Sequence, residues 1–193
     1  MKKNRLEAFS DGMFAIIMTI MVLDIKAPHG INFKDLSSTL PTMLCYLQSF
    51  WFVGNYWSTH HHILHTVKRV TGTILVANLN LLFWLSLIPF VTGWVSESDF
   101  APDPVIVYAI ALLLPGFAWT ILQKVIEKHN TWDDNMKVVM KRQETKAYIS
   151  IALYVAAIPL AFVNTYISEV LFIAVAIIWI IPDKRIEMAM KKE

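Results

Sequence analysis

Six apolar segments, each long enough to cross a lipid bilayer as a helix, follow one another along this chain. Crossing the hydrocarbon core takes about 20 helical residues, with a range of about 17–25. Hydrophobic residues make up 56% of the 193 residues and charged residues only 17%, which is too apolar for an ordinary soluble domain. We therefore predict an all-α integral membrane protein with six transmembrane helices. The predicted helices span approximately residues 5–25, 38–65, 71–95, 104–127, 145–163 and 165–182.

The six segments are interpreted as one domain, residues 1–193. The chain contains no Gly/Ser-rich linker, low-complexity tract or internal repeat, so a central pore is expected to form by oligomerisation. Its one cysteine, Cys45, excludes an intrachain disulfide and a cysteine metal cage. The first segment has no small-residue cleavage site, so we expect it to be retained as a helix.

Basic residues predict the orientation, because Lys and Arg near helix ends are retained on the cytoplasmic side. With the N-terminus in the cytoplasm, every Lys and Arg except Lys26 and Lys34 lies on that side. Both termini are therefore predicted to be cytoplasmic. The outer loops then carry an excess of acidic residues, which concentrates cations near the outer surface. These residues are Asp24, Asp35, Glu97, Asp99, Asp103 and Glu169.

The first predicted helix has two different faces. At 100° per residue, Ile16, Thr19, Ile20 and Leu23 share one face, which is apolar except for a single hydroxyl. Asp11 points roughly the opposite way. Taken from this helix alone, the apolar stripe is also compatible with lipid contact or with packing in a core.

Asp11 requires a partner, because a carboxylate inside a membrane segment costs about 2.5–3.5 kcal/mol and normally faces the protein interior. The second and third predicted helices bring their most polar residues to the same depth. We predict that Asp11 and Ser10 bond to this polar layer and fix the rotation of the first helix. A structural lock is the preferred interpretation and a proton relay the alternative. The layer consists of Trp57, His60, His61, His62, His65, Asn78 and Asn80.

Metal and enzyme chemistry are not expected. His61 and His65 are four residues apart, a spacing that suits a pair of metal ligands. No Glu, Asp or Cys of the same helix completes the coordination shell, however, so we predict no metal site and no cofactor. The chain also lacks a nucleophilic Ser motif, a Gly-rich phosphate loop and a separated pair of catalytic carboxylates, which argues against an enzyme.

The residues of the first half resemble a known family. Arg5-x-x-x-Phe9-Ser10-Asp11 is followed by AIIMTIMVLDI, and the segments YWSTHHHIL and ANLNLLFWLSLIPF come later. This combination resembles the prokaryotic branch of the endo-lysosomal potassium channel family, transmembrane protein 175. The second half resembles it only in the number of helices. The resemblance implies a homotetramer in the plasma membrane of a prokaryote, with the first helix lining the pore and no re-entrant selectivity loop.

Carried over by position, the resemblance implies a narrowest ring at Ile16, a threonine layer at Thr19 and a second apolar ring at Leu23, with Ile20 adjacent. A tight ring of branched apolar side chains excludes water and blocks ions, and threonine hydroxyls can replace part of an ion's hydration shell. Arg5 is expected to join Ser10 and Asp11 in anchoring the helix.

The expected function is therefore a potassium-permeable cation channel that is moderately selective for K+ over Na+. Its expected partners are its own copies, the lipid bilayer and monovalent cations such as permeant K+, with no nucleic acid. The alternative is a proton- or metal-coupled secondary transporter that uses Asp11 and the cluster from His60 to His65. A scaffold protein without conduction is a third possibility.

Overall fold

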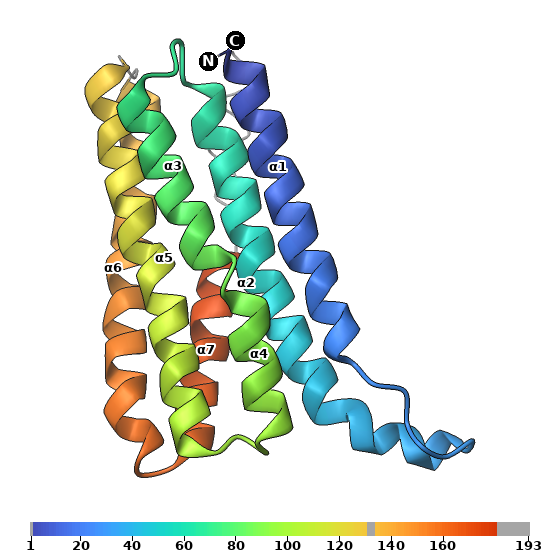
Figure 1. Cartoon of the computed structure of the whole chain (residues 1–193). Coiled ribbons are helices and arrows are strands. Elements are labelled where there is room, and N and C mark those ends of the chain that lie inside the picture. The colour runs from blue at the N-terminus through green and yellow to red at the C-terminus, as the bar shows by residue number, and fades with distance from the viewer. Residues whose placement is uncertain (1, 131–133, 181–193) are drawn as a thin grey trace.

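The computed structural model describes residues 2–130 and 134–180, which form a bundle of long helices without a β-strand (Figure 1). The prediction of an all-α protein is confirmed. The elements, in chain order, are α1 (Lys3–Ile20), η1 (Met21–Asp24), η2 (Phe33–Thr39), α2 (Leu40–His65), α3 (Gly72–Leu85), α4 (Ile88–Glu97), α5 (Pro102–His129), α6 (Asp134–Ala161) and α7 (Thr165–Ile180).

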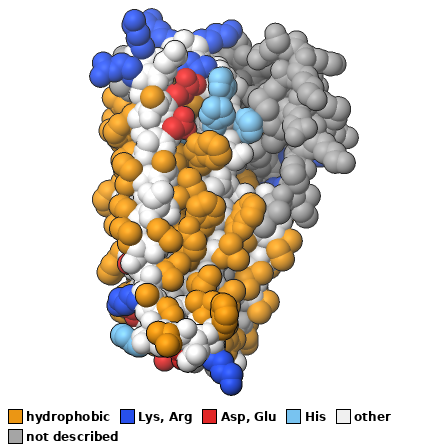
Figure 2. All heavy atoms as spheres, turned by 90° about the vertical axis from the view of Figure 1, so that its right-hand side faces the viewer, with side chains coloured by type: hydrophobic (Ala, Val, Ile, Leu, Met, Phe, Trp, Pro, Cys, Tyr) orange, Lys and Arg blue, Asp and Glu red, His pale blue; other side chains and the backbone are white. Residues whose placement is uncertain are grey.

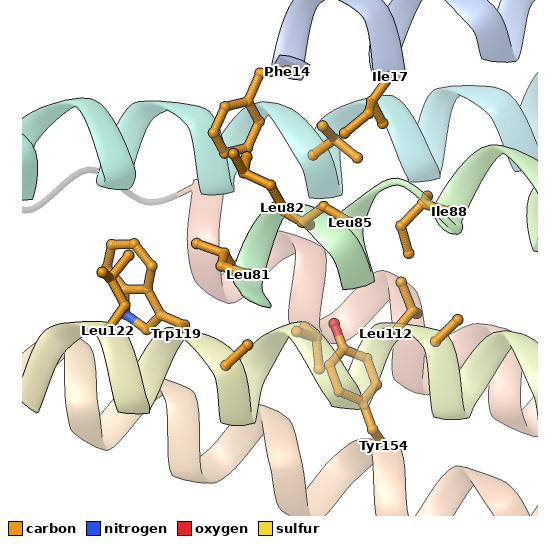
Figure 3. Packing of buried hydrophobic residues seen from close by; sticks show 14 of the residues in the cluster. Phe14, Ile17, Leu81, Leu82, Leu85, Ile88, Leu112, Trp119, Leu122 and Tyr154 are labelled. Atoms are coloured by element: carbon orange, nitrogen blue, oxygen red, sulfur yellow. The ribbon is translucent and has the colours of Figure 1, made fainter. Parts of the chain in front are cut away.

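Helix α1 stands at the edge of the bundle, where it packs along α2 and also contacts α3 and α4 (Figure 1). Its buried residues recur every three or four positions, as expected for one face of a helix. Phe14 and Ile17 point toward Leu82 and Leu85 of α3 (Figure 3). The face turned to the bundle consists of Leu6, Ser10, Phe14 and Ile17, with Met21 of η1 continuing it.

The other side of the bundle is built from α5, α6 and α7, which pack closely on one another, while α3 packs on α5. Leu112, Trp119 and Leu122 of α5 face this interior, and Tyr154 reaches it from α6 (Figure 3). One continuous cluster of buried apolar residues joins all seven helices. Between helices that cross a membrane, close van der Waals packing and interhelical hydrogen bonds are what hold α1 and α2 against the rest of the protein.

The third predicted helix, residues 71–95, is interrupted in the structure, with α3 ending at Leu85 and α4 beginning at Ile88. Pro89 has no backbone N–H, so the regular hydrogen bond to the Leu85 carbonyl is missing and the helix bends here. The Ser86 hydroxyl donates to the Phe83 carbonyl over 2.7 Å and replaces one bond at the break. Together the two helices form a 26-residue segment, Gly72–Glu97, which by length and composition can still cross a membrane.

Helix α6 begins at Asp134, well before the predicted start at residue 145. Within the charged stretch before residue 145, Val139, Met140 and Gln143 are buried at helical spacing against α5. The Gln123 side chain of α5 donates to the Met140 carbonyl over 3.5 Å. The turn expected around Asp133 and the predicted helix end at residue 182 lie outside the described residues.

Three of the described segments are long and apolar enough to cross a membrane, namely Lys3–Asp24, Gly72–Glu97 and Pro102–His129, and the shorter apolar helix Thr165–Trp179 accompanies them. Helices α2 and α6 do not meet this measure, because α2 carries buried polar side chains and α6 begins with charged ones. The count of six spans therefore stays a prediction.

The loop after η1 is tied to the end of α4 by an ion pair. Lys26 Nζ lies 2.7 Å from Glu97 Oε1, and both side chains are exposed. The hydrogen bond to Glu97, followed by its negative charge, raises the pKa of the Lys26 ammonium above its usual value. Exposed pairs of this kind add little stability.

Candidate pore-lining helix and its anchor

The residues predicted to line a pore all lie on the side of α1 and η1 that is turned away from the bundle. Ile16 is 53% exposed, Ile20 46% and Leu23 76%, and Thr19 is exposed beside them. Phe9, 49% exposed, continues the same stripe toward the start of the helix. We call these five residues the α1 stripe. A single copy of the chain leaves this apolar surface without a protein partner.

Figure 2 shows this side of the molecule: basic, acidic and histidine side chains lie at its two ends, and hydrophobic side chains cover much of the length between them. A surface of this kind matches lipid or another copy of the chain better than water. Thr19 interrupts it with a hydroxyl, which donates to the Ala15 carbonyl over 2.8 Å and also lies 3.1 Å from the Ile16 carbonyl. The hydroxyl hydrogen is thus used within the helix, and the oxygen lone pairs stay available to an ion.

A buried chain of hydrogen bonds joins the opposite face of α1 to α2 and α3. The Asn78 side-chain amide of α3 donates to Ser10 Oγ over 3.0 Å, and its carbonyl oxygen lies 2.6 Å from His60 Nε2 of α2. Because a carbonyl oxygen can only accept, His60 Nε2 carries the hydrogen. All three side chains are at most 1% exposed. Buried bonds of this kind fix a helix in one rotation, since any other rotation leaves polar groups unpaired.

Phe14, one turn beyond Ser10, covers this chain from the α1 side. Its ring centroid lies 5.2 Å from that of His60, with the planes tilted by 57°. The Ser10–Asn78–His60 chain is therefore shielded from lipid and water by an aromatic side chain of the same helix face. His60 Nδ1 has no hydrogen-bond partner among the described residues.

Asp11 is held by a different side chain at the margin of the α1–α2 contact. The indole Nε1–H of Trp57 donates to Asp11 Oδ1 over 3.0 Å. Trp57 is 41% exposed and Asp11 half-buried, so this bond lies at the surface of the monomer. Within the predicted polar layer, Trp57 thus donates the hydrogen bond to the Asp11 carboxylate, and His60 forms the hydrogen bond to Asn78.

The remaining histidines form a cluster next to this bond. His61 and His65 lie with their ring centroids 4.7 Å apart, and Trp57 and His62 flank His61 at 6.2 and 5.9 Å. Among the residues that the structure describes, no group of three or more His, Cys, Asp or Glu side chains is placed to hold a metal ion. The interactions that the structure gives among Trp57, His61, His62 and His65 are therefore contacts between aromatic rings.

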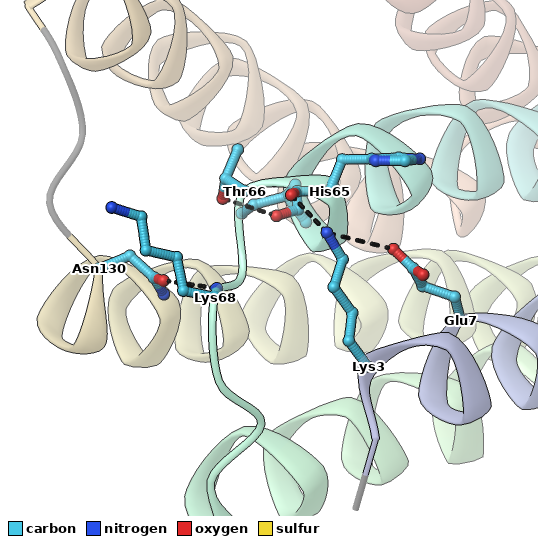
Figure 4. A network of polar contacts seen from close by, with 7 residues as sticks. Lys3, Glu7, His65, Thr66, Lys68 and Asn130 are labelled. Atoms are coloured by element: carbon cyan, nitrogen blue, oxygen red, sulfur yellow. Dashed lines mark hydrogen bonds and ion pairs between the residues drawn. The ribbon is translucent and has the colours of Figure 1, made fainter.

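The start of α1 is tied to the end of α2 by a lysine that the sequence patterns did not indicate (Figure 4). Lys3 Nζ donates to the His65 backbone carbonyl over 2.6 Å and lies 3.7 Å from Glu7 Oε1. Because the acceptor is a backbone carbonyl, side-chain patterns carry no signal for this contact. In the same region, the Lys68 N–H after α2 donates to Asn130 Oδ1 at the end of α5 over 3.1 Å.

Arg5 and Asn80 do not join the anchor. Neither side chain forms a hydrogen bond with another described residue, and Arg5 is exposed. Arg5 lies one turn before Phe9, so within a single chain it faces away from α2 and α3, and its anchoring role stays a prediction. Asn80 follows Asn78 by two positions, which turns it about 200° around α3.

The comparisons with known proteins agree on one group. Residues 5–89 match the family model described as endosomal/lysosomal potassium channel TMEM175. A protein named potassium channel from Chryseobacterium sp. strain P1-3 is 48% identical over 192 residues, covering 100% of both chains. Another protein of that name, from Chamaesiphon minutus, is 33% identical over 180 residues, covering 86% of this chain and 87% of its own.

A solved structure also matches the fold. The crystal structure of a lysosomal potassium-selective channel TMEM175 homolog from Chamaesiphon minutus superimposes with a TM-score of 0.76 at 28% identity, covering 92% of this chain and 95% of that one. The helical bundle with its anchored edge helix thus belongs to a class of membrane ion channels, not of enzymes. The chain is a member of the TMEM175 family. The family resemblance found in the sequence is confirmed.

Proposed function

We propose that this chain is a potassium-permeable cation channel in the plasma membrane of a prokaryote, assembled as a homotetramer. Four copies of α1 would surround a central pore, with permeant K+ and no cofactor. The observation that carries this proposal is the division of α1 into two faces. One face is fixed by buried hydrogen bonds to α2 and α3, and the other presents the α1 stripe outward.

The proposed topology is a single domain, residues 1–193, of six spans with both termini in the cytoplasm. In this topology α3 and α4 together make the third span, which the apolar segment Gly72–Glu97 supports. Polar side chains of α2 are compatible with a span because two of them, Ser49 and His60, are buried in the bundle. Nearly all Lys and Arg residues lie in the termini and loops that this topology places in the cytoplasm, which supports the orientation.

Gating is proposed to occur at rings formed by Ile16 and Leu23, with Ile20 between them. Branched apolar side chains cannot solvate an ion, so a tight ring of them loses its water and stops conduction. These side chains are exposed in the single chain, so they are free to meet their symmetry mates around an axis. Widening of the rings would admit water and ions without any charged group at the gate.

Selectivity is assigned to Thr19, which lies between the two rings. Its oxygen faces outward because its hydrogen is bonded to the carbonyl of Ala15. Four such oxygens would replace part of the hydration shell that an ion sheds on entering the constriction. Potassium loses its shell at lower cost than sodium, so the pore favours potassium, although less sharply than a filter lined by carbonyl groups does.

A planar bilayer recording tests the proposal. Purified protein is reconstituted with potassium chloride on one side and sodium chloride on the other, and single-channel currents are recorded over a range of voltages. The proposal predicts discrete openings with a reversal potential displaced toward the potassium equilibrium potential. The absence of discrete openings, or a reversal potential at zero, would contradict it.

The alternative, a proton- or metal-coupled transporter that uses Asp11 and the histidines from His60 to His65, is not favoured. The described residues provide no metal-binding group, and Asp11 and His60 are engaged by Trp57 and Asn78. A transporter would show slow, saturable uptake coupled to pH in place of discrete openings, so the same reconstituted protein distinguishes the two functions.

A further inference from the structure

A cavity lies between α2, α5, α6 and α7, on the far side of α2 from α1. Each of the four helices contributes an aromatic wall residue: Tyr56, Trp119, Tyr154 and Phe172. The space in which a water-sized group can sit is about 40 Å³. Since about 10–15 Å³ of such space holds one water-sized group, the cavity takes roughly three of them. A short piece of an apolar chain fits this space.

One polar group in the wall has no partner. Trp119 is 3% exposed, and its Nε1–H has no acceptor among the described residues. The neighbouring wall residue Trp179, in contrast, donates its Nε1–H to Ser150 Oγ over 2.9 Å. A buried donor without an acceptor costs free energy, so a molecule that brings an acceptor oxygen to Trp119 is favoured here.

A cation, Lys146, lies at the end of the cavity where Trp119 is found. Trp119 is the wall residue of α5 nearest to the end of that helix, and Ala147 is the first wall residue of the antiparallel α6. Lys146 directly precedes Ala147, and its Nζ lies 5.9 Å from the centre of the Trp179 ring. The cavity thus has a cationic, hydrogen-bond-donating end and an apolar, aromatic interior. Basic sites between helices on the cytoplasmic side suit anionic lipid headgroups.

We propose that this cavity is a binding site for an anionic phospholipid. Its ester carbonyl accepts the hydrogen bond from Trp119, its phosphate lies near Lys146, and the first carbons of one acyl chain fill the aromatic interior. Several wall residues are only half-buried, Asn55 of α2 and Ala176 of α7 among them, so the cavity is not sealed and the rest of the chain can leave through its wall. The assignment to the cytoplasmic leaflet rests on the proposed orientation, but binding itself does not depend on conduction.

A bound lipid at this position braces α2 against α5, α6 and α7. Helix α2 lines the cavity and is also hydrogen-bonded to α1, so it connects the lipid site to the helix that carries the α1 stripe. The lipid is therefore expected to stabilise the folded chain, by an amount that grows with the logarithm of its concentration relative to its dissociation constant.

Native mass spectrometry of the purified full chain, titrated with phosphatidylglycerol or phosphatidylcholine, tests the site. The wild-type chain is expected to retain phosphatidylglycerol in preference to phosphatidylcholine. Trp119→Phe keeps a ring but removes the donor, and should weaken phosphatidylglycerol binding about fivefold, as for the loss of one hydrogen bond. Trp84→Phe, which removes an indole N–H outside the cavity, is the matched control and should bind as the wild type does.

A second pair of variants tests the charge and does not depend on the cavity wall. Lys146→Gln should abolish the preference for phosphatidylglycerol and leave phosphatidylcholine binding unchanged, whereas Lys124→Gln, an exposed lysine of α5, should keep the preference. Equal affinity of the wild-type chain for both lipids would overturn the proposal, as would unaltered phosphatidylglycerol binding by the Trp119 variant. A chain that binds the lipid but does not conduct would contradict the channel function alone.

Discussion

Asn78 and His60 meet at 2.6 Å in the interior of the bundle, and this contact determines how α1 is held. The amide of Asn78 has one oxygen and one NH₂ group, and it uses the oxygen toward α2 and the nitrogen toward Ser10 of α1. A single side chain of α3 therefore fixes two other helices relative to each other. Removing it leaves two buried polar groups without partners at once.

Asn78→Leu should lower stability strongly for this reason. Each buried group left unpaired costs about 1–3 kcal/mol, and both His60 and Ser10 lose their partner. Thermal unfolding of the detergent-solubilised protein, followed by tryptophan fluorescence, should show a clearly lower midpoint. Asn80→Leu removes a half-buried amide of the same helix that has no hydrogen bond to the described residues, and should unfold near the wild-type temperature. Equal midpoints for the two variants would contradict the anchoring role of Asn78.

Asp11→Ala is expected to impair assembly more than ion preference. It leaves the Trp57 indole N–H without its acceptor and loosens the margin of the α1–α2 contact. Size-exclusion chromatography should show a smaller tetramer fraction, and the channels that do form should keep the wild-type reversal potential. Asp11→Asn retains an acceptor oxygen and should assemble better than the alanine variant. A fully assembled alanine variant with altered ion preference would point to a direct role of the carboxylate in permeation.

Ile16→Asn should make the closed pore leak. An amide in the tightest ring holds water where the isoleucine excludes it, so ions pass without a gating movement. Potassium flux from liposomes should rise above that of the wild type. Val22→Asn places the same amide at another exposed apolar position that lies away from the α1 stripe, and should leave the flux unchanged. Unaltered flux in the Ile16 variant would remove this residue from the gate.

Thr19→Val preserves the shape of the side chain and removes its oxygen. The reversal potential under opposed potassium and sodium gradients should move toward zero, because no hydroxyl replaces the lost hydration shell. Thr19→Ser keeps the oxygen and should keep most of the preference. A valine variant as selective as the wild type would assign selectivity to another part of the pore.

The division of α1 into faces could be predicted because helical periodicity depends only on the order of residues. Ser10, Phe14 and Ile17 repeat at three or four positions and are buried, whereas Ile16 and Leu23 fall on the other side and are exposed. Whether the exposed face meets lipid or other copies of the chain is a property of the assembly. The prediction that other copies of the chain cover this face came only from the family resemblance.

The partners within the polar layer could not be predicted individually. Trp57 and His61 share a face of α2, while His60 is turned by about 60° from Trp57 and about 100° from His61, so the choice depends on how α2 is rotated against its neighbours. That rotation follows from packing across the whole bundle. In the structure it turns Trp57 toward Asp11 and His60 toward Asn78.

Two helix boundaries differed from prediction for local reasons. The third span was predicted as one helix, but the structure interrupts it at Ser86, because Pro89 cannot form the hydrogen bond to the carbonyl four residues earlier. The predicted span begins only at residue 145, because Val139 and Met140 are embedded among lysines and an arginine and the apolar segment ends there. The helix itself continues through this charged stretch, and α5 buries its apolar side chains.

All hydrogen bonds between the described part of α1 and other helices involve Lys3, Ser10 and Asp11, within its first nine residues. The remainder of α1, from Phe14 to Ile20, touches its neighbours through apolar contacts alone. Sliding or tilting such contacts weakens attraction gradually, whereas a hydrogen bond is lost abruptly over a small displacement. The rotation of α1 is thus set by hydrogen bonds at its first turns, whereas its far end is held by side-chain packing and by the exposed Lys26–Glu97 ion pair in the loop beyond η1.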